Sequence, residues 1–323
     1  MFLKLVSSAD PRKEIIVFQS KVQECKSPIK KFDPTVFTKV INIGSLSNDS
    51  GYYLVFLKDI SASTLEAFHQ TLFPTNVDKR YFESISKGLI KGVGIIYVPP
   101  VDQRNMFKFN FSISSLFNKL LFWKQVPYED CNGIVTSLVT YRSSNFVIDN
   151  KTTIELLQFL TLHLSTFFNS RDSLNAIRLY EFHNFLLNIS GHNSYEFLDF
   201  VSMKFQTDEL SLGSIHVLDL GVRMEFRNLG IATYLLKYCF YKCKTLSRYF
   251  IYLCVACYDH AAIKLYEKAG FVKVIELDGY YIIRNQKYSA YLYIKIVNPS
   301  GLIERLAQIY SDLYLLYKSF NKY

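Results

Sequence analysis

The stretch from Gly221 to Phe240, GVRMEFRNLGIATYLLKYCF, constrains the fold more than any other part of the chain. An apolar strand pattern leads through Arg227 and Gly230 into amphipathic helical spacing. Because glycine accepts backbone angles that other residues resist, Gly230 fits a simple tight turn. It also fits an anion site, since the N–H groups at a helix start lack helical partners and the helix dipole adds positive charge there. The second interpretation predicts a ligand that carries phosphate.

The segments around this stretch alternate between strand and helix patterns. Apolar runs at 214–222 and 248–257 predict strands, and each is followed by helical spacing, the second helix ending at Gly270. A hairpin pattern follows at 280–297. Strand, helix, strand, helix, strand is typical of an α/β layer with a crossover connection. The sequence therefore predicts an α/β fold with a central sheet flanked by helices.

The first half of the chain predicts fewer elements. A strand at 52–60 precedes a helix at 61–73, and strand-like runs at 88–98 and 133–142 predict a hairpin with a long loop. We interpret residues at about 99–130 and 143–213 as two long insertions, because loops of that length usually carry structure of their own or are disordered. The expected organisation is an N-terminal extension of unknown role at 1–50, a domain at 51–298, and a C-terminal amphipathic helix at 299–323.

Composition narrows the class of protein. A chain of 323 residues, half of them hydrophobic, can bury a sizeable core, and the sequence has no apolar run of the roughly 20 residues that a spanning helix needs. We therefore expect a cytoplasmic protein. The formal net charge of +9 predicts attraction to an anion. Nucleic acid is not the expected partner, because the aromatic residues lie mostly in apolar runs such as 115–124, where core packing explains them.

Cysteine usage points to reduced thiols and to no metal. The six cysteines are too sparse and irregular for a disulfide scaffold. The pair in CVAC, Cys254 and Cys257, has zinc-like spacing, but in a continuous strand the two side chains would point to opposite faces. The sequence also contains neither the P-loop pattern nor the dinucleotide-binding glycine pattern.

Two motifs in order carry a family resemblance. Arg227, Gly230 and Ala232 form an Arg-x-x-Gly-x-Ala pattern, and AAIKLYEKAGF follows about thirty residues further along. The pair resembles the GCN5-related N-acetyltransferase (GNAT) family. LGVRMEFRNLGIATYLL, GYYIIR and LFPTNVDKRYFESI (72–85) are similar to motifs of the NatF-type protein N-terminal acetyltransferases, the last to their substrate loop. The resemblance covers about 52–297 without the two insertions, and it implies a GNAT fold.

The resemblance implies acetyl-CoA as cosubstrate, without a metal. Backbone amides from Asn228 through Thr233 would hold its pyrophosphate, with Gly230 and Ala232 small enough to allow close approach. The strand edge at Leu220 would receive the pantetheine arm of acetyl-CoA. The implied cofactor-binding residues are Leu220, Gly221, Val222, Arg227, Asn228, Leu229, Gly230, Ile231, Ala232, Thr233 and Tyr266.

The implied catalytic residues are Tyr266, His216 and Cys254. Tyr266 takes the position at which relatives place a phenol near the cofactor sulfur, where it would protonate the departing thiolate; plain helix packing is the alternative. His216 and Cys254 stand where NatF-like enzymes have a tyrosine and a histidine. With its near-neutral reference pKa, His216 would serve as the base alone or through water; a hydrogen-bonded core histidine is the alternative.

The resemblance also implies a peptide site. Its members lie on the first loop, on the strand at 214–222 and on the hairpin: Phe73, Pro74, Thr75, Leu218, Tyr280 and Tyr281. Paired tyrosines offer hydroxyls to the peptide backbone and ring faces to an apolar first side chain, which in the family is usually the initiator methionine. Val77 departs from the tyrosine that relatives keep there, which leaves the fine specificity open.

The C-terminal segment 301–323 has an apolar stripe at helical intervals, formed by Leu302, Leu306, Ile309, Leu313, Leu316 and Phe320. One interpretation is a helix docked on the domain or on a partner. The other is a peripheral helix on the cytosolic face of the Golgi or another membrane, as the resemblance implies.

The expected function is transfer of acetyl from acetyl-CoA to the free α-amine of protein N-termini by direct attack, with a general base and a tyrosine general acid. The expected N-termini begin with methionine followed by a hydrophobic or other residue. Two alternatives stay open. One is acetylation of lysine side chains. The other is an acetyl-CoA-binding pseudoenzyme or scaffold, which the departures at His216 and Cys254 favour.

Overall fold

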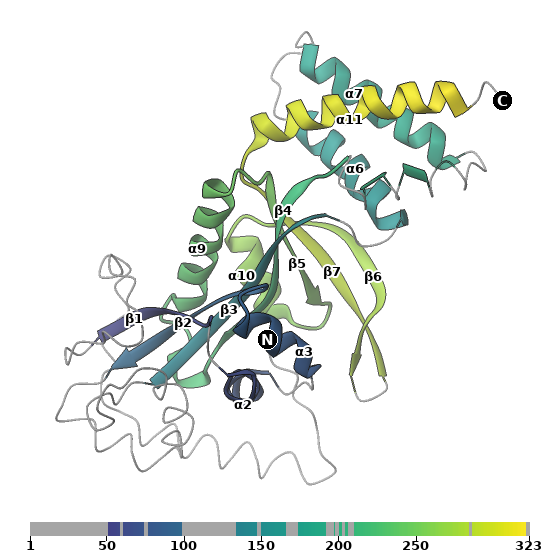
Figure 1. Ribbon diagram of the computed structural model, residues 1–323. Helices are drawn as coiled ribbons and strands as arrows, with labels where there is room; N and C mark the ends of the chain where they lie inside the picture. Colours follow the sequence, from purple (N-terminus) through teal and green to yellow (C-terminus); the bar gives the residue numbers. More distant parts are fainter. Residues whose placement is uncertain are drawn as a thin grey trace. The chain divides into compact units, whose positions relative to one another are not determined.

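The computed structural model describes residues 51–58, 61–73, 77–98, 134–146, 150–165, 174–191, 197, 200–201, 204–205, 210–283 and 286–320 (Figure 1). These residues form two compact units. Unit 1 takes its described residues from Met1–Arg142 and Val217–Lys237, and unit 2 takes its own from Ser143–His216 and Tyr238–Tyr323. The expected N-terminal extension at 1–50 and the first insertion at about 99–130 lie outside the described residues.

Unit 1 is built on antiparallel strands with two helices before the second strand. The strands follow the order β1-β2-β3-β4, in which β4 enters with its second half. Leu54 pairs with Ile95, and Val93 pairs with Val139, so the predicted hairpin between the second and third strands is confirmed. The elements are β1 (Gly51–Phe56), α2 (Ala62–Leu72), α3 (Lys79–Ser86), β2 (Lys91–Val98), β3 (Ile134–Asn145), the second half of β4 (Gly213–Val222), η4 (Met224–Phe226) and the start of α9 (Ile231–Thr245).

Helix α3 occupies a segment that the resemblance assigns to a substrate loop. The helix begins after Asp78, whose side chain accepts a hydrogen bond from Arg80 N at 2.9 Å, the usual role of an N-cap aspartate. Phe82 and Ile85 lie on one face, three residues apart, and both are buried. The second half of the segment 72–85 is therefore a helix and not a loop, because a cap and an apolar stripe specify one.

Unit 2 contains the mixed part of the sheet. The order is β4-β5-β7-β6, with β4 entering by its first half. Ile215 of β4 pairs in parallel with Ile251 of β5, and β7 is antiparallel to both β5 and β6. The predicted C-terminal hairpin is confirmed, although its first strand begins at Val272, earlier than expected. The elements are β5 (Phe250–Ala256), α10 (His260–Lys268), β6 (Val272–Ile283), β7 (Gln286–Ile296), α6 (Asn150–Ser165), α7 (Leu174–Gly191) and α11 (Pro299–Phe320).

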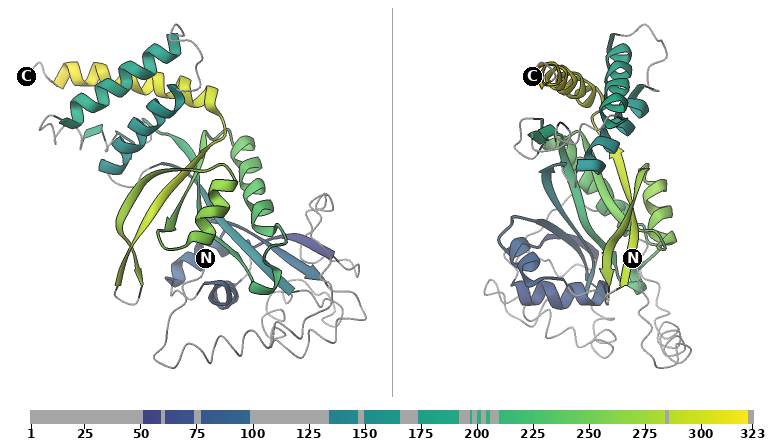
Figure 2. Two further views of the ribbon diagram at one scale, coloured as in Figure 1. Left: turned by 180° about the vertical axis from the view of Figure 1, so that it is seen from behind. Right: turned by 90° about the vertical axis from the view of Figure 1, so that its right-hand side faces the viewer.

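Three helices of unit 2 share one hydrophobic core with residues of strands β5, β6 and β7. Helices α6 and α7, which lie in the second insertion, pack on each other and on α11, and α7 and α11 cross in the left view of Figure 2. Leu157 and Phe182 from the insertion and Leu302 and Leu306 from α11 are all 0% exposed. Because the apolar stripe of α11 is buried within its own unit, the structure supports the docked interpretation of the C-terminal helix. Across the helices that the structure describes, none combines the length and apolar character that a bilayer span requires.

Candidate active site

The turn before α9 has the backbone conformation that an anion site needs. Asn228 has φ 61° and Gly230 has φ 87°, both in the left-handed region. The carbonyl oxygen of Gly230 accepts a hydrogen bond from Tyr234 N at 3.0 Å, so the first helical turn starts at once. The side chain of Ile231 is 1% exposed and anchors this turn in unit 1. The N–H groups that open α9 have no acceptor within the helix and lie next to the exposed Asn228 and Gly230.

The connection from β4 to α9 is held by backbone contacts within unit 1. Arg223 N donates to Thr136 O of β3 at 2.8 Å, and Arg227 Nε donates to Val222 O at 3.2 Å. Phe226 is buried, and its ring lies 5.8 Å from that of Tyr97. Arg227 therefore contacts the end of β4, which brings two of the predicted cofactor-binding residues together.

Phe73 packs directly on the end of β4. A β-carbon at position 221 would lie 2.6 Å from Phe73 Cζ, so only glycine fits there. Phe73 is itself 5% exposed, which makes it a packing residue as well as a predicted peptide contact. Leu220 is buried, while Leu218 and Val222 are half-buried. The other two predicted members of the first loop, Pro74 and Thr75, lie outside the described residues.

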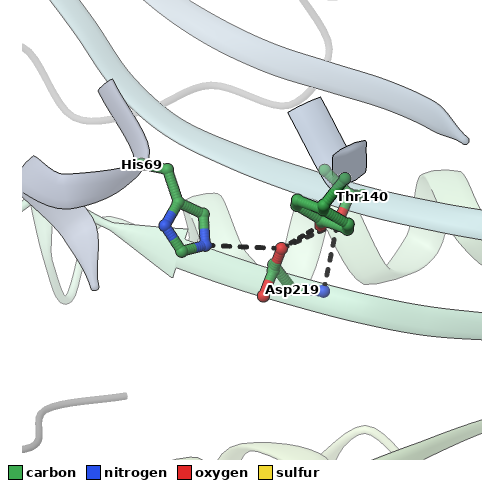
Figure 3. A network of polar contacts seen from close by, with 4 residues as sticks. His69, Thr140 and Asp219 are labelled. Carbon is green, nitrogen blue, oxygen red and sulfur yellow. Dashed lines mark hydrogen bonds and ion pairs between the residues drawn. The ribbon is translucent and has the colours of Figure 1, made fainter. Parts of the chain in front are cut away.

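A buried polar network lies beside Phe73, and no motif in the sequence indicates it (Figure 3). Its centre is Asp219 Oδ2, which accepts a hydrogen bond from the hydroxyl of Tyr81 and another, of 3.1 Å, from the hydroxyl of Thr140. His69 Nε2 lies 3.5 Å from the same oxygen. The backbone N–H of Asp219 donates to Thr140 Oγ1 at 3.1 Å, which fixes the strand against β3. Three side chains, from α2, α3 and β3, thus meet at one carboxylate oxygen of β4.

The network combines one ionisable acid with buried partners. His69 is 2% exposed and lies against the rings of Phe73 and Phe82, at 4.6 and 5.3 Å between centroids. Burial, and then the neighbouring Asp219 carboxylate, raise the pKa of Tyr81, so that its hydroxyl stays a donor. A carboxylate inside an apolar strand was the signal available in the sequence. Its partners could not be found there because Tyr81 is 138 residues away.

His216 belongs to unit 2 and stacks on its neighbour in β5. The rings of His216 and Tyr252 lie 4.3 Å apart between centroids at an interplanar angle of 13°. His216 is half-buried, whereas Tyr252 is 1% exposed. The stacking holds the imidazole plane on the sheet, which is compatible with either interpretation of this histidine.

The structure brings Cys254, Tyr280 and Tyr281 together in unit 2. Tyr281 donates its hydroxyl hydrogen to Cys254 O at 2.9 Å, and the rings of Tyr280 and Tyr281 meet edge to face at 4.9 Å. Burial raises the pKa of the Cys254 thiol to about 11, and the hydrogen bond with the Tyr280 side chain lowers it by less. Cys254 is therefore a neutral thiol at pH 7 and not a base. Tyr280 is 40% exposed, which leaves its ring open to a ligand.

Tyr266 lies on a well-defined helix of unit 2. Helix α10 is capped by Asp259, whose Oδ1 accepts a hydrogen bond from Ala262 N at 3.0 Å. The helix ends before Gly270, which has φ 84°. Tyr266 is 8% exposed and its ring meets Phe271 edge to face at 5.8 Å. The phenol is thus held on a rigid element. This arrangement is compatible both with a general acid and with a residue that only packs in the core.

The described residues contain no group of three or more His, Cys, Asp or Glu side chains placed to hold a metal ion. Cys257 lies beyond the end of β5, and its thiol contacts Glu276 Oε1 at 3.8 Å. Cys239 and Cys243 are both buried in α9, where burial raises the pKa of each thiol.

Comparisons with known proteins bear on the segment that holds these motifs. Residues 158–271 match the model of the acetyltransferase (GNAT) family. Histone acetyltransferase MCC1 of Arabidopsis thaliana is 33% identical over 123 residues, a match that covers 33% of this chain and 50% of that relative. The chain therefore spans about half the length of the curated relative that it matches.

Two of the solved structures to which the chain is similar come from the same plant. Arabidopsis thaliana NAA60 in complex with a bisubstrate analogue is 16% identical with a TM-score of 0.44, covering 77% of this chain and 100% of that one. Arabidopsis thaliana Naa50 in complex with the bisubstrate analogue CoA-Ac-MVNAL is 16% identical with a TM-score of 0.40, covering 76% of this chain and 97% of that one. The family match includes β4, the start of α9, β5 and α10. Residues 158–271 are thus similar to a GNAT acetyltransferase domain, and the chain has the mixed α/β fold expected for one.

Proposed function

We propose that the protein transfers the acetyl group of acetyl-CoA to the free α-amine of protein N-termini. The observation that carries the proposal is the turn at Asn228 and Gly230, which lies inside the family match and leaves the first amides of α9 open to an anion. The pyrophosphate of acetyl-CoA is an anion of the size that a helix start binds. Exposed positions at Asn228, Gly230 and Thr233 leave room for it.

The preference for an N-terminal amine is supported by the motifs that resemble the NatF-type enzymes. Phe73 closes α2 and covers the end of β4, and the paired Tyr280 and Tyr281 lie on the hairpin, where an apolar first side chain would pack against a ring. The hydroxyl of Tyr281 donates a hydrogen bond to the backbone of β5. Tyr280 has the more exposed ring of the pair.

In the proposed reaction the amine nitrogen attacks the thioester carbonyl, a C–N bond forms, and the C–S bond breaks. The nitrogen loses one proton to a base, and the departing thiolate gains one. Tyr266 is the proposed acid, and His216 is the proposed base, alone or through water. The raised pKa of the Cys254 thiol supports this division of roles, because a neutral thiol does not accept the proton of the amine.

Acetylation of lysine side chains is the second candidate. Its support is the 33% identity with a relative described as a histone acetyltransferase. Both candidates use acetyl-CoA and a primary amine, so the same cosubstrate site would serve either of them. They differ only in the acceptor.

One experiment separates these functions. The purified chain is incubated with acetyl-CoA and a peptide pool in which some peptides begin Met-Leu or Met-Lys with a free N-terminus and others are N-blocked with internal lysines. Mass spectrometry then locates each acetyl group. Acetylation confined to free N-termini supports the proposal, and acetylation of the blocked peptides alone replaces it with lysine acetylation. Acetyl-CoA binding without transfer to either class would favour the pseudoenzyme.

A membrane role for α11 is not part of the proposal. The first four side chains of its stripe are 0% exposed within unit 2, so they have no free surface for lipid: Leu302, Leu306, Ile309 and Leu313. The cytoplasmic location remains a prediction from the sequence.

A further inference from the structure

The buried network around Asp219 treats the two oxygens of its carboxylate differently. Oδ2 accepts hydrogen bonds from the hydroxyls of Tyr81 and Thr140 and lies 3.5 Å from His69 Nε2. Oδ1 has no hydrogen-bond donor in the part of the chain that the structure describes. Since an ionised carboxylate can accept about four hydrogen bonds, one oxygen is occupied and the other is open.

The four side chains of the network also differ in how far they are exposed to solvent. The side chain of Asp219 is 21% exposed, whereas that of His69 is 3% exposed. Thr140 is 1% exposed, and Tyr81 is half-buried. The Asp219 carboxylate and the Tyr81 side chain are therefore the members of the network that a ligand in solution can reach, while the buried His69 and Thr140 hold the carboxylate from inside.

The network also lies next to the residues that the proposed function uses in unit 1. The ring of Phe73 meets His69 at 4.6 Å between centroids and covers Gly221, two residues after Asp219 on β4. The end of α2 thus touches both the network and the strand segment expected to receive substrates. A carboxylate that is fixed on one side and open on the other, at this position, suits a cationic group.

We propose that Asp219 binds the primary ammonium group of the acceptor through Oδ1, with Tyr81, Thr140 and His69 as positioning residues that hold Oδ2. The inference rests on the proposed function for the nature of the acceptor. An α-ammonium and a lysine ε-ammonium share this chemistry, so either acceptor class fits the carboxylate. Tyr81 stays protonated because of its burial, which keeps it a donor to Oδ2 throughout the neutral range.

The first test measures binding, independently of turnover. Calorimetry on the full chain with bound CoA compares a lysine-free decapeptide beginning Met-Leu with its des-amino counterpart, and a second pair compares an N-blocked lysine peptide with its norleucine form. The parent protein should prefer the amine in one pair by roughly ten- to hundredfold, the range for a hydrogen bond to a charged group. Asp219→Asn should abolish that preference, and the pair concerned identifies the source of the ammonium group.

Variants of the partners separate positioning from folding. Tyr81→Phe and Thr140→Val should reduce the preference for the amine over its des-amino counterpart, a ratio that general loosening of unit 1 would leave unchanged. Glu304→Gln, which changes an exposed carboxylate of α11, is the matched control and should keep the full preference. Unchanged thermal unfolding and CoA affinity in Asp219→Asn establish that this variant is folded.

The transfer assay then distinguishes failure of this site from failure of the function. If the parent transfers acetyl and Asp219→Asn keeps both the parent KM and the amine preference, the inference is overturned and the function stands. If the parent transfers acetyl to no amine but shows an amine preference that Asp219→Asn loses, the function falls and the site stands. A parent protein with no amine preference in either pair overturns the inference directly.

Discussion

The ring of Phe73 covers Gly221 so closely that a β-carbon at position 221 would lie 2.6 Å from Cζ and 3.0 Å from Cε2 of that ring. Real β-carbons do not approach another atom so closely. The position of the Phe73 ring therefore requires glycine at 221, and the ring can take this position only because residue 221 is glycine. The contact joins the last turn of α2 to the end of β4, where the resemblance places both the peptide and the pantetheine arm. Two residues assigned to different substrates are thus one packing unit.

Gly221→Ala should therefore displace Phe73 and lower both stability and transfer activity. Overpacking of this kind typically costs about 1–3 kcal/mol of unfolding free energy. Chemical denaturation measures the first effect and acetyl transfer the second. The double variant Phe73→Leu, Gly221→Ala removes the ring atoms that clash and should recover part of the stability; equal instability of the double variant would contradict the contact.

The turn before α9 makes a second prediction. Gly230 has φ 87°, a conformation that costs a residue with a β-carbon roughly 1–2 kcal/mol. Gly230→Ala should therefore weaken acetyl-CoA binding in calorimetry, because the turn that presents the amides must distort or carry that strain.

Asn228→Gly is the matched control for this turn. Asn228 has φ 61°, so glycine relieves strain there without changing the backbone path. Acetyl-CoA affinity should be retained. Loss of affinity in Asn228→Gly together with full affinity in Gly230→Ala would show that the turn geometry does not matter for binding.

Cys254 carries a prediction about pH. Burial raises the pKa of its thiol to about 11, so the folded protein holds less thiolate at neutral pH than the unfolded chain. The alkylation rate of Cys254 should rise with pH up to about 11 in the folded state, and level off near the reference value of about 8.5 in denaturant. Peptide mass spectrometry after timed iodoacetamide labelling follows this cysteine alone; rapid labelling of the folded protein at pH 7 would restore a thiolate base.

The C-terminal helix offers a pair of matched positions. Leu306 is 0% exposed and Leu315 is 67% exposed on the same helix. Leu306→Ala should lower the unfolding free energy of unit 2 by about 2–5 kcal/mol, and Leu315→Ala should leave it nearly unchanged. Denaturant titration compares the two variants. Equal stability would mean that the stripe does not pack on α6 and α7, and would return the membrane interpretation of this helix.

Much of the fold could be predicted because its signals are local. The apolar alternation of β4, the continuous apolar run of β5, the helical spacing of α10 and the glycine that follows it are all set by near neighbours. The same holds for the turn at Gly230, whose conformation follows from one residue type and its position before a helix. The sequence did not lead us to predict the helix α3, although its N-cap Asp78 and the apolar residues Phe82 and Ile85 were signals for one.

The sequence by itself determined the order of strands and helices and the turn that opens α9, since each depends on residues a few positions apart. Only the tertiary structure decided which distant side chains meet: His69 and Tyr81 at Asp219, Phe73 on Gly221, and α11 on the helices of the second insertion. These contacts depend on strand register and on the docking of helices over the sheet. A single carboxylate in an apolar strand does not specify its partners, because folding alone brings them within hydrogen-bond distance.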